Sequence, residues 1–243
     1  MKEFEVFQDL AALPVTTDAC LFGSWVENQL SNYLSETPAA KILDIGTGTG
    51  LLSFMLAQKH HNCKIIGLDI HQPSITNANQ SLAVNRQNYY KYYNVEFLNQ
   101  DFIISKQFQK NEFNVIISNP PFFQNQLESS NKTRNIARHS NELTPELLIS
   151  KSAELLKDNG QLFLLYPKSE CNSIMNLLNK HFTVNQLVET KPTPSKNPNL
   201  VFIHAEKTAL KNKFKSFEFC VYQEPGILSN NAISYLKDYY ITL

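Results

Sequence analysis

Short apolar segments alternate with longer segments of helical character from residue 40 to about residue 205. The short segments are rich in Ile, Val, Leu and Phe, which is typical of buried strands. A parallel pair of strands needs a long crossover connection between its members, and that connection is usually a helix. The alternation therefore predicts an α/β fold, with a central, mostly parallel, seven-stranded sheet and helices on both faces.

Seven strands and four crossover helices make up the expected alternation. The strands are 40–45, 64–68, 95–98, 114–118, 161–166, 183–188 and 200–204, and the helices are 51–59, 73–86, 145–157 and 171–180. We expect a single domain over 1–243 with two additions. A helix over 17–34, capped by Thr17 or Asp18 and burying Trp25, belongs to an N-terminal extension of about residues 1–37. A strand over 217–222 and a helix over 232–240 belong to a C-terminal addition of about 210–243.

Bulk composition excludes several classes of protein. The formal net charge is zero, with 22 basic and 22 acidic side chains, so a nucleic-acid partner would need a local basic patch. The four cysteines have neither zinc-ligand spacing nor the density of a disulfide framework, so we expect no metal site. No apolar stretch approaches the ~20 residues that span a bilayer. We expect a soluble, cytoplasmic protein without membrane association.

A glycine-rich turn follows the first strand of the alternation. It reads Asp44-Ile-Gly46-Thr47-Gly48-Thr-Gly50 and resembles motif I of class I S-adenosylmethionine-dependent methyltransferases. Its spacing is shorter than that of dinucleotide binders, and no P-loop lysine follows. Asp69 and Asp101-Phe102 end the next two strands. Any one of these acids alone would more simply be a helix cap or a solvated strand end. Three acids at successive carboxyl ends, where open α/β sheets bind ligands, favour a cofactor site, with NAD as a minor alternative.

The segment Asn119-Pro120-Pro121-Phe122 ends the fourth strand. Two prolines cannot continue a sheet ladder because neither has an N–H to donate. The Asn119 amide oxygen and the Pro120 carbonyl can each accept one hydrogen of a planar amino group, while Phe122 stacks on the attached base. Phe123 is an alternative platform. The same sheet edge would then hold both cofactor and acceptor.

Two segments are candidates for RNA contact. Residues 124–143 form a long polar segment that contains Arg134 and Arg138. Lys211 and Lys213 belong to a basic stretch with interleaved aromatic residues after the last expected strand of the alternation. A solvated loop and an ordinary lysine-rich turn are the competing interpretations.

Nearly the whole chain resembles the bacterial tRNA1(Val) (adenine-37-N6)-methyltransferases. The resemblance rests on Phe4-x-x-Phe7-Gln8, on the Val15–Trp25 segment, on the glycine turn, on Ile117–Phe123 and on the terminal Tyr-Leu-Lys-Asp-Tyr-Tyr. Two segments depart from the family pattern: Pro14 stands where a lysine is common, and 196–200 lacks a usual arginine.

The resemblance implies a Rossmann-like class I fold and methyl transfer from S-adenosylmethionine to N6 of an adenosine in tRNA. It assigns Asp101 to the adenine amino group and Phe102 to the adenine ring. Asp44, directly or through water, would take the ammonium of the cofactor's amino-acid tail. The Asn-Pro-Pro-Phe motif also occurs in enzymes that modify rRNA guanine N2, DNA adenine N6 and protein glutamine N5. These acceptors, and a noncatalytic cofactor- or RNA-binding module, stay open as alternatives.

Overall fold

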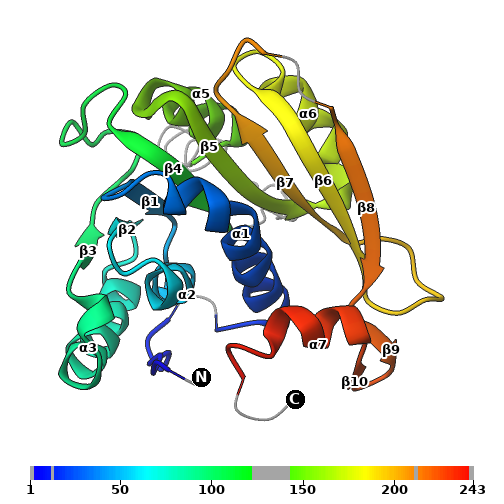
Figure 1. The fold of residues 1–243 in the computed structure, drawn as a ribbon, viewed down its shortest axis with the longest axis horizontal. Helices are drawn as coiled ribbons and strands as arrows, with labels where there is room; N and C mark the ends of the chain where they lie inside the picture. Colours follow the sequence, from blue (N-terminus) through cyan, green and yellow to red (C-terminus); the bar gives the residue numbers. More distant parts are fainter. Residues whose placement is uncertain (1–2, 12–13, 122–142, 211–212, 241–243) are drawn as a thin grey trace, which may run out of the picture.

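The computed structural model describes residues 3–11, 14–121, 143–210 and 213–240. Its centre is an eight-stranded sheet in the order β3-β2-β1-β4-β5-β7-β6-β8 (Figure 1). β7 is antiparallel to β5 and β6, and the other pairings are parallel. The α/β class and the mostly parallel sheet are confirmed.

The seven expected strands are present within a few residues of their predicted bounds. They are β1 (Lys41–Ile45), β2 (Lys64–Asp69), β3 (Val95–Asn99), β4 (Phe113–Ser118), β5 (Leu156–Pro167), β6 (Thr183–Lys191) and β7 (Leu200–Glu206). The eighth strand is β8 (Lys215–Cys220), which pairs with β6. It overlaps the strand predicted for the C-terminal addition. The sheet has eight strands rather than seven because this segment extends it instead of lying apart. A short hairpin, β9 (Tyr222–Glu224) and β10 (Ile227–Leu228), follows.

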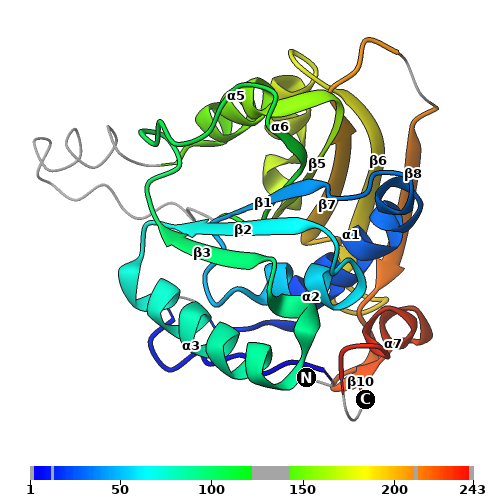
Figure 2. The ribbon, with the colours of Figure 1, turned by 60° about the vertical axis from the view of Figure 1, so that its left-hand side comes forward.

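Helices cover both faces of the sheet (Figures 1 and 2). One face carries α1 (Thr17–Ser35), α2 (Leu51–Lys59), α3 (Gln72–Asn88) and α7 (Asn230–Leu236), and the other carries α5 (Pro145–Leu155) and α6 (Cys171–Leu178). Two short 3-10 helices, η1 (Tyr90–Tyr92) and η2 (Lys168–Glu170), connect longer elements. No helix in the described ranges is long and apolar enough to cross a membrane.

The N-terminal helix α1 is part of the core. Trp25 is fully buried, as predicted, and its ring packs on Phe163 and Phe202, with centroids 5.6 Å away in each case. The predicted cap is wrong by one residue or more: Thr16 is the N-cap, and its hydroxyl accepts from the Ala19 backbone N–H at 3.2 Å. Thr16 has the extended backbone that a capping residue needs, whereas Thr17 and Asp18 are already helical.

The boundary between α5 and β5 differs from the prediction, which continued the helix to residue 157. Leu156 already pairs with Phe113 on β4, and the next paired residue on β5 is Gln161. The intervening residues form a bulge that includes Asn159, whose φ is +60°. A β-bulge inserts residues into one strand without ending it, so Asn159-Gly160 lies within the strand rather than at the end of the helix.

Candidate functional site

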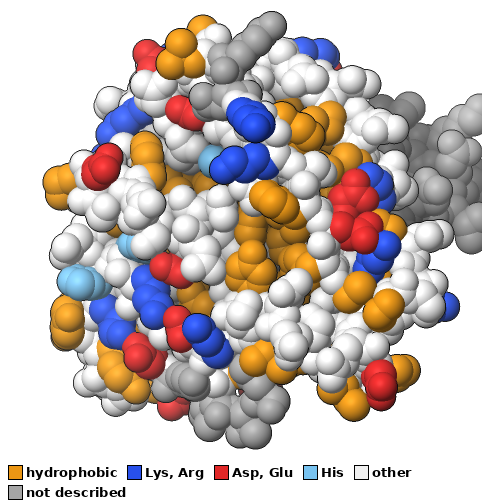
Figure 3. Space-filling view, turned by 45° about the vertical axis from the view of Figure 1, so that its right-hand side comes forward, with side chains coloured by type: hydrophobic (Ala, Val, Ile, Leu, Met, Phe, Trp, Pro, Cys, Tyr) orange, Lys and Arg blue, Asp and Glu red, His pale blue; other side chains and the backbone are white. Residues whose placement is uncertain are grey.

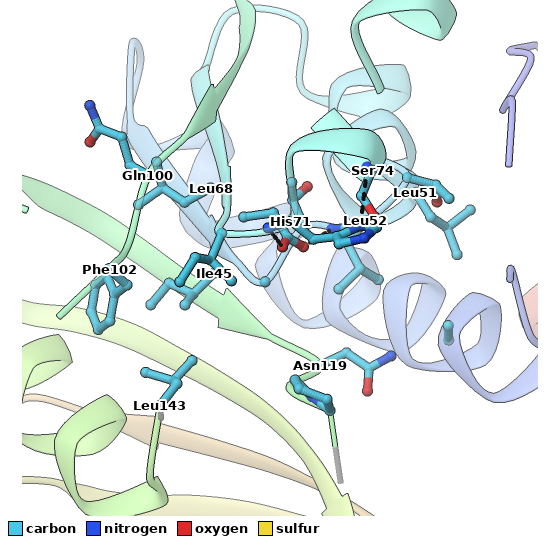
Figure 4. A pocket seen from close by; sticks show the side chains of 18 of the residues that line it. Ile45, Leu51, Leu52, Leu68, His71, Ser74, Gln100, Phe102, Asn119 and Leu143 are labelled. Carbon is cyan, nitrogen blue, oxygen red and sulfur yellow. Dashed lines mark hydrogen bonds between the residues drawn. The ribbon is translucent and has the colours of Figure 1, made fainter. Parts of the chain in front are cut away.

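A cavity of about 530 Å³ lies at the carboxyl ends of β1, β2, β3 and β4. β1 pairs with β2 on one side and with β4 on the other, so the chain order reverses between β1 and β4. Open α/β sheets bind ligands at such a switch point. The lining residues come from the glycine turn, from the ends of β2 and β3, and from the segment after β4 (Figure 4).

The glycine turn leaves open space at the cavity wall. Gly46 and Gly48 line the cavity with φ of +70° and +54°, and a Cβ added to either would meet no atom within 4 Å. Gly50 is different, because its Cβ would lie 2.5 Å from the Phe97 ring in the core. The first two glycines therefore let a ligand approach the backbone, whereas the third allows α2 to pack closely.

Asp44 is fully buried and does not itself line the cavity. Its Oδ2 accepts from the Thr47 hydroxyl at 2.6 Å and from the Ser53 hydroxyl at 2.8 Å, while Oδ1 has no hydrogen-bond partner. Burial raises the pKa of this carboxyl to about 6. Asp44 thus braces the turn against α2, and its free oxygen is the acceptor left for a cation or a water.

Asp69 lines the cavity and connects two of its walls. One carboxylate oxygen accepts from the Gly48 backbone N–H and the other from the His71 backbone N–H, both at 2.8 Å. Each carboxylate oxygen has more than one acceptor site, so the group can still receive a hydroxyl from a ligand. The neighbouring Ile70 side chain is 65% exposed and also lines the cavity.

The turn after β3 forms the opposite wall. Asp101 and Phe102 line the cavity, and the Asp101 carboxylate accepts from the Ile103 backbone N–H at 2.7 Å. The ammonium of Lys151, on α5, lies 5.1 Å from the centroid of the Phe102 ring and donates to backbone carbonyls of this turn. Nothing in the sequence pattern pointed to Lys151.

The segment after β4 reaches the same cavity. Asn119 and Pro121 line it, and Pro120 is buried between them. The preceding Ser118 hydroxyl donates to the Ile45 carbonyl at 2.8 Å, which ties the end of β4 to the end of β1. Among the described residues, the predicted cofactor and acceptor residues therefore share one cavity, apart from Asp44 and Gly50, which brace it from behind, and Pro120, which is buried and does not line it.

The sequence analysis missed the contribution of His71 and Ser74. His71 is the N-cap of α3: its Nδ1 lies 2.8 Å from the Ser74 hydroxyl and accepts from the Ser74 backbone N–H at 3.3 Å. Both residues line the cavity. The available signal was Pro73 in the first helical turn, which predicts a helix start within a residue or two of His71.

The N-terminal segment supplies a further wall through Pro14, Val15 and Ala19. Asp18 lies beside this wall without lining the cavity, and burial raises the pKa of its carboxyl. The segment around Glu5 and Phe7 is attached to α3, since the backbone N–H groups of these two residues donate to the side chains of Asn85 and Ser81, both at 2.8 Å.

Several predicted site residues lie outside the described residues. They are Phe122, Phe123, Arg134, Arg138 and Lys211. Lys213 is described and exposed. It precedes β8, which runs parallel to β4, so it lies towards the end of the sheet away from the cavity.

Comparison with known proteins identifies relatives of the whole chain. Residues 27–193 match the family described as "Methyltransferase small domain". A tRNA1(Val) (adenine(37)-N6)-methyltransferase of Bacteroides thetaiotaomicron is 34% identical over 195 residues, covering 79% of this chain and 76% of the relative. One of the same description from Trichodesmium erythraeum is 29% identical over 244 residues, covering 99% and 96%.

Solved structures share the fold at low sequence identity. A predicted O-methyltransferase from Agrobacterium tumefaciens superposes with a TM-score of 0.68 at 17% identity, covering 90% of this chain and 95% of the other. A methyltransferase from Pyrococcus furiosus gives a TM-score of 0.59 at 19% identity, covering 84% and 89%. Both support the Rossmann-like architecture.

Proposed function

We propose that this chain, which belongs to the methyltransferase small domain family and is an S-adenosylmethionine-dependent methyltransferase, methylates N6 of an adenosine in tRNA. Its relatives are described as acting on adenine 37 of tRNA1(Val). That position is our proposed target for this chain as well.

The cavity suits the cofactor in shape and in chemistry. The open space above Gly46 and Gly48 admits an amino-acid tail against the backbone, with the free oxygen of Asp44 behind the turn for its ammonium, directly or through water. Asp69 is available to ribose hydroxyls. Asp101 is assigned to the adenine amino group and Phe102 to the adenine ring. When bound, the cofactor supplies an electrophilic methyl group carried on a sulfonium.

Asn119 and Pro120 would hold the acceptor. The Asn119 amide oxygen and the Pro120 carbonyl each accept one hydrogen of the adenine amino group, which orients the nitrogen lone pair towards the methyl group. Positive charge develops on that nitrogen during transfer, and two acceptor dipoles stabilise it. The ammonium formed is acidic enough to lose its proton to water, so no strong base is required. Phe122 would stack on the base, a contact typically worth ~1–3 kcal/mol.

A single observation carries the proposal: Asn119 and Pro121 line the same cavity as the glycine turn, Asp69 and Asp101. A noncatalytic module would have no need to bring the amine-binding segment and the cofactor walls together. The hydrogen bond from Ser118 to Ile45 ties the two strand ends to one another. Donor and acceptor sites are therefore preorganised at one sheet edge.

The tRNA contacts outside the flipped nucleoside are proposed at Arg134, Arg138, Lys211 and Lys213. Figure 3 turns the β8 side of the molecule forward and shows an apolar patch with Lys and Arg side chains along its upper border. Phe214 and Phe217, near Lys213, are 49% and 53% exposed. Exposed aromatic rings beside lysines suit stacking and phosphate contact. Phe217 pairs with Val188, Val188 with Phe202, and Phe202 with Leu165, the residue after the partner of Ser118. Phe217 therefore lies at the same height in the sheet as Asn119.

Charge reversal tests the role of Lys213. Lys213→Glu should weaken tRNA binding several-fold. It should also reduce the dependence of binding on salt, because a complex with one fewer phosphate contact releases fewer counterions when it forms. Lys110→Glu, which removes an ion-pairing lysine from the loop before β4, is the control. Equal affinity and equal salt dependence in wild type and Lys213→Glu would remove Lys213 from the proposed RNA surface.

The decisive experiment for the function is transfer of labelled methyl from S-adenosylmethionine to total tRNA, total rRNA, DNA and protein, followed by analysis of the labelled product. N6-methyladenosine in tRNA alone is the expected result. Label in protein or in another nucleic acid would identify one of the alternative acceptors and overturn the proposal.

A second experiment tests the role of Asn119. Asn119→Ala should lower the transfer rate at least ~100-fold, the usual effect of removing one transition-state hydrogen bond. Cofactor affinity, measured by calorimetry, should change little. Retained activity would exclude the amide oxygen as an acceptor of the amino hydrogens.

A further inference from the structure

The amino group of Lys151 occupies an unusual position beside the cofactor cavity. Its Nζ donates to three backbone carbonyls of the turn after β3: Phe102 at 2.5 Å, Ile103 at 2.7 Å and Ser105 at 3.0 Å. An ammonium has three N–H donors and no acceptor, so these contacts use all of them. The side chain therefore serves the turn and has no donor left for another group.

The turn that Lys151 binds is not part of a helix or a strand. Residues 100–107 follow β3 as a succession of turns and bends. Within it, Asp101 accepts from the Ile103 N–H through its side chain and from the Ser105 N–H, at 3.1 Å, through its carbonyl. Carbonyls that point to one side of such a turn need donors from elsewhere. Lys151 supplies them from α5.

The position of the lysine also connects two walls of the cavity. α5 begins at Pro145, and Leu143, two residues earlier, lines the cavity near Phe102 in Figure 4. The ammonium lies 5.1 Å from the centroid of the Phe102 ring, within the range of a cation–π contact. Partial burial lowers the pKa of Lys151, while Glu154 and Asp101 act in the opposite direction. The Asp101 carboxylate and the Phe102 ring thus both depend on where this side chain is held.

We propose that Lys151 is a positioning residue for the adenine end of the cofactor, and that it sets the selectivity of the site for adenine over a 6-oxo purine. It fixes the turn so that the Asp101 carboxylate faces the cavity, where it accepts from the amino group on C6, with the Phe102 ring beside it. A 6-oxo purine carries an oxygen at that position and would oppose the carboxylate with a second acceptor. The inference rests on the proposed assignment of Asp101 and Phe102 to adenine.

Binding of two product analogues tests the inference without any catalytic turnover. S-adenosylhomocysteine and S-inosylhomocysteine, which differ in the group on C6, are titrated into wild type and Lys151→Met by calorimetry. The affinity of wild type for the adenine compound should exceed its affinity for the inosine compound at least tenfold. That ratio corresponds to about one hydrogen bond of ordinary strength. In Lys151→Met, the preference should fall below about threefold, mainly through weaker binding of the adenine compound.

Two further variants separate positioning from general loss of structure. Lys157→Met removes a lysine whose Nζ donates to Asn114 at 3.0 Å, away from the cavity, and should keep the full preference. Lys151→Gln retains an amide donor and should be intermediate between wild type and Lys151→Met. If Lys151→Met does not fold, Lys151→Gln carries the test, and the preference in that variant must still fall.

The outcomes distinguish the assignment of Asp101 to adenine from the positioning role of Lys151. A wild type without preference for the adenine compound overturns the assignment of Asp101, and the positioning role falls with it. A wild type with that preference, retained in full by Lys151→Met and Lys151→Gln, overturns the positioning role alone. Amide exchange at Ile103 and Ser105 gives an independent readout, since both amides should exchange faster once the turn loses its lysine.

Discussion

The two turns at opposite walls of the cofactor cavity are stabilised by different means. The turn after β1 is held by Thr47 and Ser53, which lie 3 and 9 residues from the Asp44 that they bind. The turn after β3 is held by Lys151, which lies 46 to 49 residues from its partners and on another helix. The first turn is thus held within its own strand–helix unit and by the adjacent β2, where Leu68 and Asp69 accept from the Thr47 and Gly48 N–H groups, both at 2.8 Å. The second requires that α5 has docked on the sheet.

The difference has a functional meaning. A turn that is braced by its own helix and the adjacent strand does not depend on the docking of α5, which suits the wall proposed for the amino-acid tail of the cofactor. The turn after β3 is braced from α5 and therefore responds to any shift of that helix. The wall proposed for adenine therefore depends on the position of α5, whereas the glycine wall does not.

The largest expected effect comes from filling the glycine wall. Gly48→Ala places a methyl group into the open space of the cavity, so the affinity for S-adenosylhomocysteine should fall about 100-fold or more, ~2.7 kcal/mol by calorimetry. Gly226→Ala is the matched control, since Gly226 also has a positive φ, of +81°, and open space around it. Both substitutions carry ~1–2 kcal/mol of backbone strain. Loss of affinity in the control as well would show that strain, and not occupancy of the wall, is responsible.

Removing one local brace should have the next largest effect. Ser53→Ala leaves the buried Asp44 carboxylate with a single hydroxyl partner, and the free energy of unfolding should fall by about 2–3 kcal/mol in a denaturant titration. Ser35→Ala removes an exposed hydroxyl that donates to the Asn32 carbonyl, and should change little. Equal stability of the two variants would contradict a local brace.

The pH dependence of stability gives a third comparison. Burial raises the pKa of Asp44 to about 6 from an ordinary value of 3.8, so folding favours its protonated form. The resulting stabilisation is fully present below pH 3.8 and is lost as the pH rises through 6. As the pH rises from 4.5 to 7, the free energy of unfolding of the cofactor-free wild type should therefore fall by roughly 1–2 kcal/mol relative to that of Asp44→Asn. Parallel melting-temperature profiles of the two proteins would exclude this contribution.

The smallest effect concerns the N-terminal wall. Thr16→Ala removes the cap of α1 and should cost ~1 kcal/mol of stability, whereas Thr17→Ala should cost less because Thr17 is already within the helix. Thermal melts of the two variants make the comparison. A larger loss of stability in Thr17→Ala than in Thr16→Ala would show that Thr17, as the sequence pattern predicted, is the N-cap.

Local chemistry explains which parts of this site can be predicted from sequence. Asp44 lies near the end of an apolar strand, and the glycines and Asn119 directly follow such strands, so their place at one sheet edge follows from the alternation alone. Lys151 has no such signal, because a lysine in an amphipathic helix ordinarily faces solvent and its three carbonyl partners come from a turn far away in the chain. The hydrogen-bonding environment of a turn is a tertiary property.

The same contrast applies to the fold. The seven strands of the alternation were predictable because each is a short apolar run. The start of β5 was not, since Leu155-Leu156-Lys157 continues a helical pattern and only the pairing of Leu156 with Phe113 makes it a strand. The N-cap of α1 was not predictable either, because Thr16, Thr17 and Asp18 are all residue types that cap helices. The backbone dihedral angles, which the sequence does not give, decide among them.

The position of α1 bears on how the chain reaches its native state during synthesis. α1 is translated before β5, β7 and α7, yet its Trp25 packs on rings from β5 and β7, and its Ser24 hydroxyl donates to the Tyr235 carbonyl 211 residues later in the chain. Such contacts close only after their partners are translated. The Ala19 wall of the cavity should therefore assemble only after β5, β7 and α7 have been translated, and a nascent chain should acquire full cofactor affinity no earlier than that.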